Sequence, residues 1–152
     1  MGIKTIATNR RARFNYQITE TYEAGIVLLG SEVKSLRAGH ADLKDSYASV
    51  RGGEMWLVGL RISPYAYARD GGHEPERERK LLLHKREIGK IGSKLAEQGL
   101  SLLPMSLYFK NGKVKVELGL GKGKAQRDKR ETLRRRQADR EMERAMRHRS
   151  LD

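Results

Sequence analysis

The chain has 152 residues, of which 32 are Lys or Arg and 19 are Asp or Glu, so its net charge is +13. No cysteine is present and the four histidines are scattered, which excludes a disulfide framework and thiolate chemistry and leaves no expected metal or cofactor. The positive surplus favours nucleic acid as the partner. An anionic membrane surface competes less well, because no stretch places Trp, Phe and Leu beside the charge.

The N-terminal half predicts a strand followed by a short helix. From Phe14 to Tyr22, apolar and polar residues alternate with period two, which is typical of a β-strand. A short apolar run over 24–29 closes at Gly30, after which Ser31 is the expected N-cap of a helix that ends at Gly39.

Two hairpins and a second helix are predicted further along. The pair Gly52-Gly53 separates apolar segments over 47–50 and 55–62, and Asn111-Gly112 separates segments over 100–109 and 113–120. Such dipeptides favour two-residue type I′ turns. Residues 69–79 read as a charged loop, and an apolar helical face follows it and stops at Gly99.

These elements predict a mainly β fold without strand–helix–strand alternation. Five or six short antiparallel strands with two or three short helices indicate a small antiparallel β-barrel of OB-fold type, or a sandwich. Residues 1–120 are the expected body, and residues 121–152 the expected tail. The start of the chain offers no long apolar segment and no myristoylation signal, so we expect a soluble, cytoplasmic protein.

The tail from Gly121 onward cannot form a core, because it has no aromatic residue and few large apolar ones. Its twelve Lys and Arg against six acids give it a net charge of +6. From Asp128 onward it contains good helix formers and neither Pro nor Gly, and Arg136, Arg140 and Arg144 fall on one helical stripe. We therefore expect a tail that is disordered when free and helical when bound to a polyanion. The alternative is a solvated helix without a partner.

Catalytic signatures are missing, since the sequence contains no P-loop, nucleophile elbow, H-E-x-x-H or dinucleotide fingerprint. The run GLGKGK over 119–124 lacks the Walker spacing and is interpreted as a flexible basic exit from the last strand. The cluster over 9–13 sets arginines beside the aromatic strand, a combination that RNA-binding proteins use. Its alternative is a solvated N-terminus next to core aromatics.

A series of motifs carries a family resemblance: NRRARFNY, YEAG, GSEVKSLRAG, DSY, RKLLL, LYFKNGKVKVELGLGKGK and DKR. In this order the motifs resemble the small protein B family, the SsrA-binding proteins of bacterial trans-translation. The resemblance runs from Asn9 to about Arg149. It implies an OB-fold body that binds the tRNA-like domain of transfer-messenger RNA, and a tail that forms a helix in the decoding region and messenger channel of the small ribosomal subunit.

The resemblance also implies site residues. The family's RNA-contacting positions fall on Glu23, Leu82 and Lys115, and the tail motif falls on Asp128, Lys129 and Arg130. With the neighbouring basic segments, the candidate RNA-binding residues are Arg10, Arg11, Arg13, Glu23, Lys34, Arg37, Leu82, Lys115, Lys122, Gly123 and Lys124. The candidate ribosome-binding residues of the tail are Arg127, Asp128, Lys129, Arg130, Arg134, Arg136, Arg140 and Arg144.

Arg127 departs from the resemblance, because relatives often carry His before the D-K-R motif. An arginine can still stack on a base and keeps a fixed charge, so the change is physically tolerable.

The expected function is that of a non-enzymatic RNA-binding adaptor. GTP hydrolysis would belong to elongation factor Tu, an indirect partner. The main alternative is a structural ribosomal protein whose basic tail threads through ribosomal RNA. An RNA-cleaving or RNA-modifying enzyme is disfavoured, because no cluster of carboxylates or histidines suggests a catalytic centre.

Overall fold

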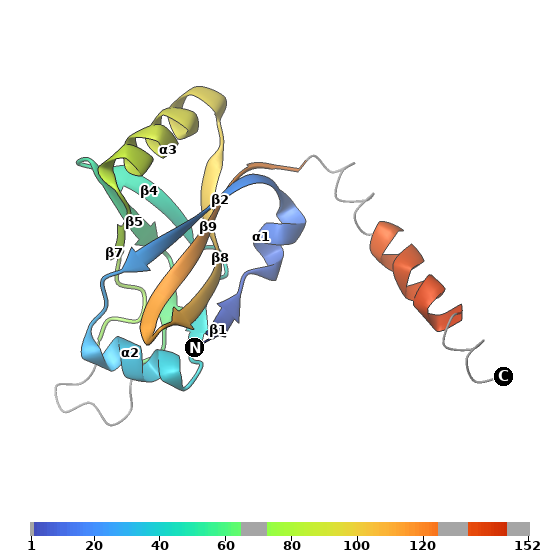
Figure 1. Cartoon of the computed structure of the whole chain (residues 1–152), viewed down its shortest axis with the longest axis horizontal. Helices are drawn as coiled ribbons and strands as arrows, with labels where there is room; N and C mark the ends of the chain where they lie inside the picture. Colours follow the sequence, from blue (N-terminus) through green and yellow to red (C-terminus); the bar gives the residue numbers. More distant parts are fainter. Residues whose placement is uncertain (1, 65–72, 125–133, 146–152) are drawn as a thin grey trace.

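The computed structural model describes residues 2–64, 73–124 and 134–145 (Figure 1). Its labelled helices are α1 (Arg10–Asn15), α2 (Gly30–Arg37) and α3 (Lys85–Gln98), and a further helix spans 134–145. The strands are β1 (Ile3–Thr8), β2 (Tyr16–Ile26), β3 (Ala41–Asp42), β4 (Tyr47–Arg51), β5 (Glu54–Val58), β6 (Arg61–Ile62), β7 (Arg79–Leu82), β8 (Ser101–Lys110) and β9 (Lys113–Gly123).

The strands close into a barrel. The main sheet has the order β1-β8-β4-β5-β7-β2-β9, and β8 also pairs with β9, so six strands form a ring with β1 added to β8. All pairings are antiparallel, and β4 meets β8 through the single pair Ala48↔Leu102. The predicted mainly β fold and small antiparallel barrel are confirmed, and the closed ring excludes the sandwich alternative.

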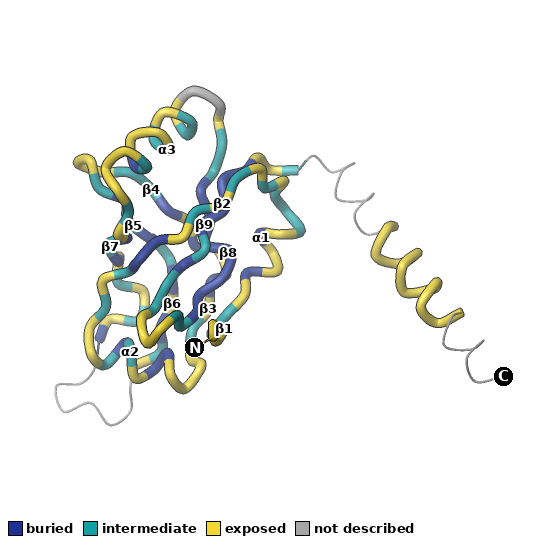
Figure 2. The backbone as a smooth tube through the Cα atoms, viewed as in Figure 1, coloured by how far each residue is buried: buried dark blue, intermediate teal, exposed yellow. Residues whose placement is uncertain are grey.

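The core fills the barrel with side chains from alternate strand positions. On β9, Val116, Leu118 and Leu120 are fully buried, whereas Lys113 at the start of the strand is exposed. Helix α3 contributes Ile88 and Ile91 to the same cluster, so it packs on the barrel with one apolar face. Figure 2 shows this division between buried strands and exposed helix surfaces.

Both predicted hairpins are confirmed, with the turn geometry that their dipeptides favour. Asn111 and Gly112 have φ of 52° and 77°, and Lys110 pairs with Lys113 across the turn. Gly52 and Gly53 have φ of 59° and 75°. Positive φ at both central residues is the requirement of a type I′ turn, which glycine and asparagine meet at low cost.

The N-terminal prediction was wrong in its details. Residues Ile3–Thr8 form β1, and Phe14 belongs to α1, so the aromatic strand begins at Tyr16. Asn9 is buried and caps α1: its side chain accepts from the Ala12 amide at 3.1 Å and donates to the carbonyl of Pro104 at 3.0 Å. These tertiary contacts stabilise a helix of six residues, which is too short to leave a sequence pattern.

The glycine-rich run over 119–124 is not a flexible exit, because β9 continues through Gly123. Gly121 pairs with both Ile18 and Ser101, and a Cβ there would lie 2.4 Å from the Gln17 carbonyl oxygen. The glycine is required where β9 passes close to β2. The expected boundary between residues 120 and 121 thus falls within a strand.

Helix α2 starts two residues earlier than predicted, and Ser31 is not its N-cap. The N-cap is Leu29, whose amide donates to Glu32 Oε1 at 2.8 Å. Glu32 has no exposed surface. This acid in the first turn of α2 is therefore a core residue.

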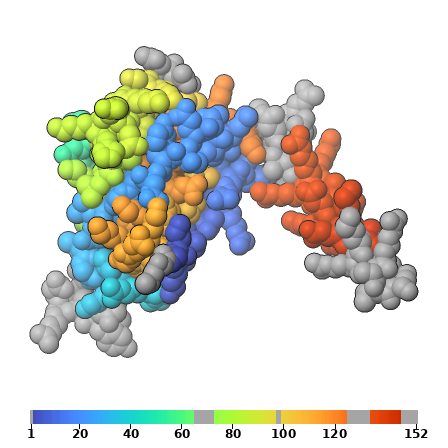
Figure 3. All heavy atoms as spheres, in the orientation of Figure 1, coloured from blue at the N-terminus to red at the C-terminus, as the bar shows by residue number. Residues whose placement is uncertain are grey.

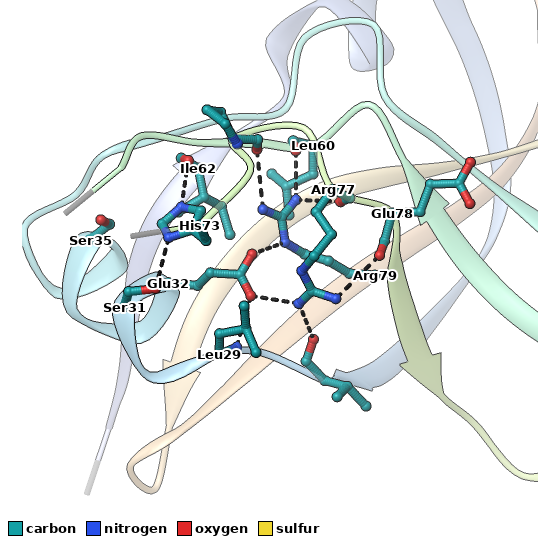
Figure 4. A network of polar contacts seen from close by, with 12 residues as sticks. Leu29, Ser31, Glu32, Ser35, Leu60, Ile62, His73, Arg77, Glu78 and Arg79 are labelled. Atoms are coloured by element: carbon teal, nitrogen blue, oxygen red, sulfur yellow. Dashed lines mark hydrogen bonds and ion pairs between the residues drawn. The ribbon is translucent and has the colours of Figure 1, made fainter. Parts of the chain in front are cut away.

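Glu32 is the centre of a buried polar network (Figure 4). Arg79 donates to Glu32 Oε2 at 2.5 Å and Arg77 donates to Oε1 at 2.6 Å. The fully buried Arg79 guanidinium also donates to the carbonyls of Leu60 at 2.7 Å and Pro75 at 3.1 Å. The network joins α2, the segment after β5 and the start of β7, so the charged end of the predicted 69–79 loop is firmly anchored.

The network favours the ionised form of Glu32. Burial acts to raise the pKa of this carboxyl, but the hydrogen bonds from Arg77, the Leu29 amide and Arg79 outweigh it, so the pKa lies below its ordinary value. The resulting stabilisation is present above the unfolded-state pKa and is lost as the pH falls through the lower folded-state pKa.

Substitution Glu32→Gln should lower the free energy of unfolding by about 3–5 kcal/mol, because it leaves the fully buried Arg79 and the half-buried Arg77 without their counter-ion. Urea unfolding at neutral pH measures this change. As a control, Glu78→Gln breaks the exposed pair with Arg51 and should cost less than about 1 kcal/mol. Equal effects of the two substitutions would contradict a structural role for the buried network.

Substitution Gly121→Ala should destabilise the barrel by about 1–3 kcal/mol, because the new methyl group overlaps the β2 backbone. Gly123→Ala is the matched control on the same strand, since its nearest contact would be Tyr16 at 3.9 Å, and it should change stability by less than about 0.5 kcal/mol. Thermal unfolding of the two variants distinguishes crowding at Gly121 from a general effect of glycine replacement.

Candidate nucleic-acid interface

Three of the predicted RNA-binding residues meet on the outer face of the barrel. Gly25 on β2 pairs with Leu82 on β7 and with Lys115 on β9, and Glu23 lies two residues before Gly25 on the same face of β2. Glu23, Leu82 and Lys115 line one groove of about 470 Å³. Residues 23, 82 and 115 are far apart in sequence, and strand register alone brings them together.

Gly25 forms the floor between these side chains. A Cβ at this position would lie 3.2 Å from the Leu82 Cβ, so a larger residue would press against the leucine. Leu82 is 52% exposed although it is a large apolar residue in a strand. Because Gly25 is buried and has no side chain, Leu82 lies over the β2 backbone, and its exposed side chain offers an apolar surface for a ribose or base.

The carboxylate of Glu23 is held by two donors that the sequence analysis missed. The Tyr108 hydroxyl donates to Glu23 Oε2 at 2.5 Å, and Lys110 Nζ lies 3.2 Å from both carboxylate oxygens. The hydrogen bond from Tyr108, with that from Lys110, lowers the pKa of Glu23. Burial raises the pKa of Tyr108, and Glu23 raises it further. At neutral pH Glu23 is thus an ionised acceptor with free lone pairs.

Basic residues surround this surface. Lys115 stands beside Gly25, Lys110 contacts Glu23, and Lys80 on β7 is bonded to Glu54 at 2.9 Å. The candidates Lys34 and Arg37 are exposed on α2, which begins four residues after β2 ends. Cations from three strands, β7, β8 and β9, therefore border the Glu23 end of β2.

A second group of predicted residues lies at the other end of β2 and β9. Tyr16 pairs with Gly123, and the Lys124 amide donates to the Asn15 carbonyl at 2.8 Å. Arg10, Arg11 and Arg13 are exposed on α1, and Lys122 and Gly123 are exposed at the end of β9. Nine residues of strand separate Tyr16 from Gly25, or about 30 Å at the rise of an extended chain. In Figure 3, β2 and β9 run side by side across the face between these two ends.

The predicted tail residues are described only in part. Arg134, Arg136, Arg140 and Arg144 belong to the helix 134–145, in which every residue is exposed (Figure 2). The Arg136 guanidinium lies 5.7 Å from the centroid of the Phe14 ring on α1. Arg127, Asp128, Lys129 and Arg130 lie outside the described residues. Whether the tail becomes helical only on binding stays a prediction.

Within the described ranges, no three His, Asp or Glu side chains gather as metal ligands. Across those ranges, no helix is long and apolar enough to cross a membrane.

Comparison with known proteins bears on the resemblance predicted from the motifs. A model of the SmpB protein family matches residues 6–148. The SsrA-binding protein of Thermosynechococcus vestitus is 55% identical over 149 residues, which are 97% of this chain and 98% of that protein. That of Thermobifida fusca is 54% identical over 148 residues, covering 97% of this chain and 92% of its own length.

A solved structure has a fold similar to that of this chain. Its chain comes from work on tmRNA-SmpB and the center of the bacterial ribosome, and matches with a TM-score of 0.67 and 47% identity. The match covers 85% of this chain and 94% of that chain. The family model matches most of the chain, and the relatives align with it over nearly its full length at about 55% identity. Together with the motif order and the barrel topology, this shows that the chain belongs to the SmpB protein family, the SsrA-binding proteins.

Proposed function

We propose that this protein is an RNA-binding adaptor of bacterial trans-translation, which binds the tRNA-like domain of transfer-messenger RNA and brings it to stalled ribosomes. Family membership and likeness to the SmpB chain solved in work on the bacterial ribosome support this function. The observation that carries it is the strand register that gathers Glu23, Leu82 and Lys115 around Gly25.

The groove offers three kinds of contact that suit a folded RNA. Lys115 supplies a cation for a phosphate, and Leu82 supplies an apolar surface for a base or ribose. Glu23 accepts hydrogen bonds, and base amino groups are suitable donors for it. Because an ionised acid repels phosphate, the RNA places a base edge against Glu23 and not its phosphate backbone.

The second basic group serves the same RNA or the ribosome at the opposite end of the barrel. Arg10, Arg11 and Arg13 lie on α1, Lys122 lies on β9 and Lys124 follows this strand directly, so all five are near the point where the tail leaves the body. The tail then reaches the decoding region and messenger channel of the small subunit. Arg134, Arg136, Arg140 and Arg144 are exposed in their helix and free to face ribosomal phosphates.

The adaptor acts by binding and catalyses no reaction. Elongation factor Tu is an indirect partner that supplies GTP hydrolysis during delivery. The protein works in the cytoplasm, because its partners are the translation machinery.

Substitution Lys115→Ala should weaken binding of the tRNA-like domain about tenfold, which corresponds to the loss of one charge-assisted contact. Lys113→Ala removes the same charge two residues away, at the hairpin turn, and should change the affinity less than twofold. Mobility-shift titration measures both. If the two variants bind alike, the groove does not hold the RNA.

The double substitution Asp128→Ala with Lys129→Ala should leave RNA affinity unchanged and abolish tagging of nascent chains on stalled ribosomes. The reason is that these residues belong to the ribosome-directed tail and not to the RNA-binding body. An in vitro translation assay with a messenger that lacks a stop codon measures tagging. Loss of RNA binding by this variant would contradict the division between body and tail.

A further inference from the structure

The groove that holds Glu23, Leu82 and Lys115 continues into a second groove between α3 and the turn that joins β4 to β5. The second groove also measures about 470 Å³, and the two share Gly53, Glu54, Lys85 and Ile88 in their linings. A ligand seated against Leu82 can therefore extend along α3 without leaving the surface.

Helix α3 carries exposed cations, of which Lys85 lines both grooves. Lys85, Arg86 and Lys90 are exposed on the N-terminal half of α3, and none of them forms a salt bridge within 4.0 Å to any residue in the described ranges. The acids nearby are already engaged, because Glu54 binds Lys80 at 2.9 Å and Glu87 accepts from the His84 amide at 3.3 Å. The three cations are thus available to an anionic partner.

Two glycines lie in α3 near these cations, although the fold does not require glycine at either position. Gly89 and Gly92 lie inside the 14-residue α3, where glycine destabilises a helix relative to alanine. A Cβ on Gly89 would meet nothing within 4 Å, and one on Gly92 would meet only Val50 at an ordinary 3.7 Å. Packing within the protein explains neither residue, whereas close approach of a partner's backbone explains Gly89.

We infer that the RNA-binding surface extends over α3, where Lys85, Arg86 and Lys90 contact the phosphodiester backbone of the RNA held at Glu23, Leu82 and Lys115. Gly89 lies one turn after Lys85 and one residue before Lys90. The RNA backbone therefore passes over Gly89, between the two cations. The inference rests on the proposed function and adds a second set of contacts to it. Charge complementarity and continuity of the two grooves identify RNA as the occupant.

The first test compares two double variants that remove the same charge. Lys85→Ala with Lys90→Ala removes two cations of the α3 surface, and Lys4→Ala with Lys44→Ala removes two exposed cations elsewhere. Binding of the tRNA-like domain of transfer-messenger RNA is titrated at several KCl concentrations. The α3 variant should lose at least tenfold in affinity and reduce the slope of log K against log salt by about 0.7–0.9 for each lost contact.

The control variant should bind within about twofold of the wild type with the same salt slope. Equal losses in both double variants would show that only total charge matters and would overturn the inference while leaving the proposed function intact. If the wild type itself fails to bind this RNA in an excess of bulk tRNA, the proposed function is wrong and the inference falls with it.

The second test separates folding from binding at Gly89. Gly89→Gln replaces a helix-interior glycine with a good helix former in open space, so it should raise Tm by about 2–4 °C. It should also weaken RNA binding at least fivefold, because the side chain occupies the path of the RNA backbone. Ala96→Gln adds bulk to an exposed position of the same helix outside this groove and should leave the affinity unchanged. A stabilised Gly89→Gln variant with wild-type affinity would overturn close approach of RNA to the helix.

Discussion

The buried carboxylate of Glu32 fixes the part of the barrel that carries the proposed RNA-binding surface. It binds Arg79, the first residue of β7, and Arg77 just before it, and so determines where β7 begins beside β2. Only two residue pairs join β2 to β7, of which Gly25↔Leu82 is one. A slip of one residue would turn Leu82 inward and Leu81 outward. An ion pair remote from the surface thus decides which side chain stands beside Gly25.

Strand register and charge act together on the outer face. The pairings of β2 gather an acid, a leucine and a lysine from three strands around one glycine, and Tyr108 and Lys110 hold the acid in its ionised form. A surface that was only basic would bind any phosphate backbone. The Glu23 carboxylate, held among cations, instead favours an RNA that places base amino groups at this point. A protein needs such a preference if it is to select one folded RNA from many.

The sequence predicted the elements whose signals are local. The Gly52-Gly53 and Asn111-Gly112 turns and the period-two strands were correct because each depends on a few adjacent residues. Helix α1 was missed because Asn9 is fixed by Pro104 across the fold, and Arg79 was assigned to a loop because nothing local indicates burial of an arginine. Glu23, Leu82 and Lys115 came from family resemblance, and Tyr108 could not be found because it lies 85 residues from its partner Glu23.

We propose that the body selects one RNA by its shape and not merely by its charge. A mobility-shift titration of the full-length protein with the tRNA-like domain of transfer-messenger RNA, at physiological salt and with a large excess of bulk tRNA, tests this directly. We expect tight binding that survives the competitor. A shift that disappears when bulk tRNA is added would mean that the protein is a general polyanion binder and would contradict the adaptor function.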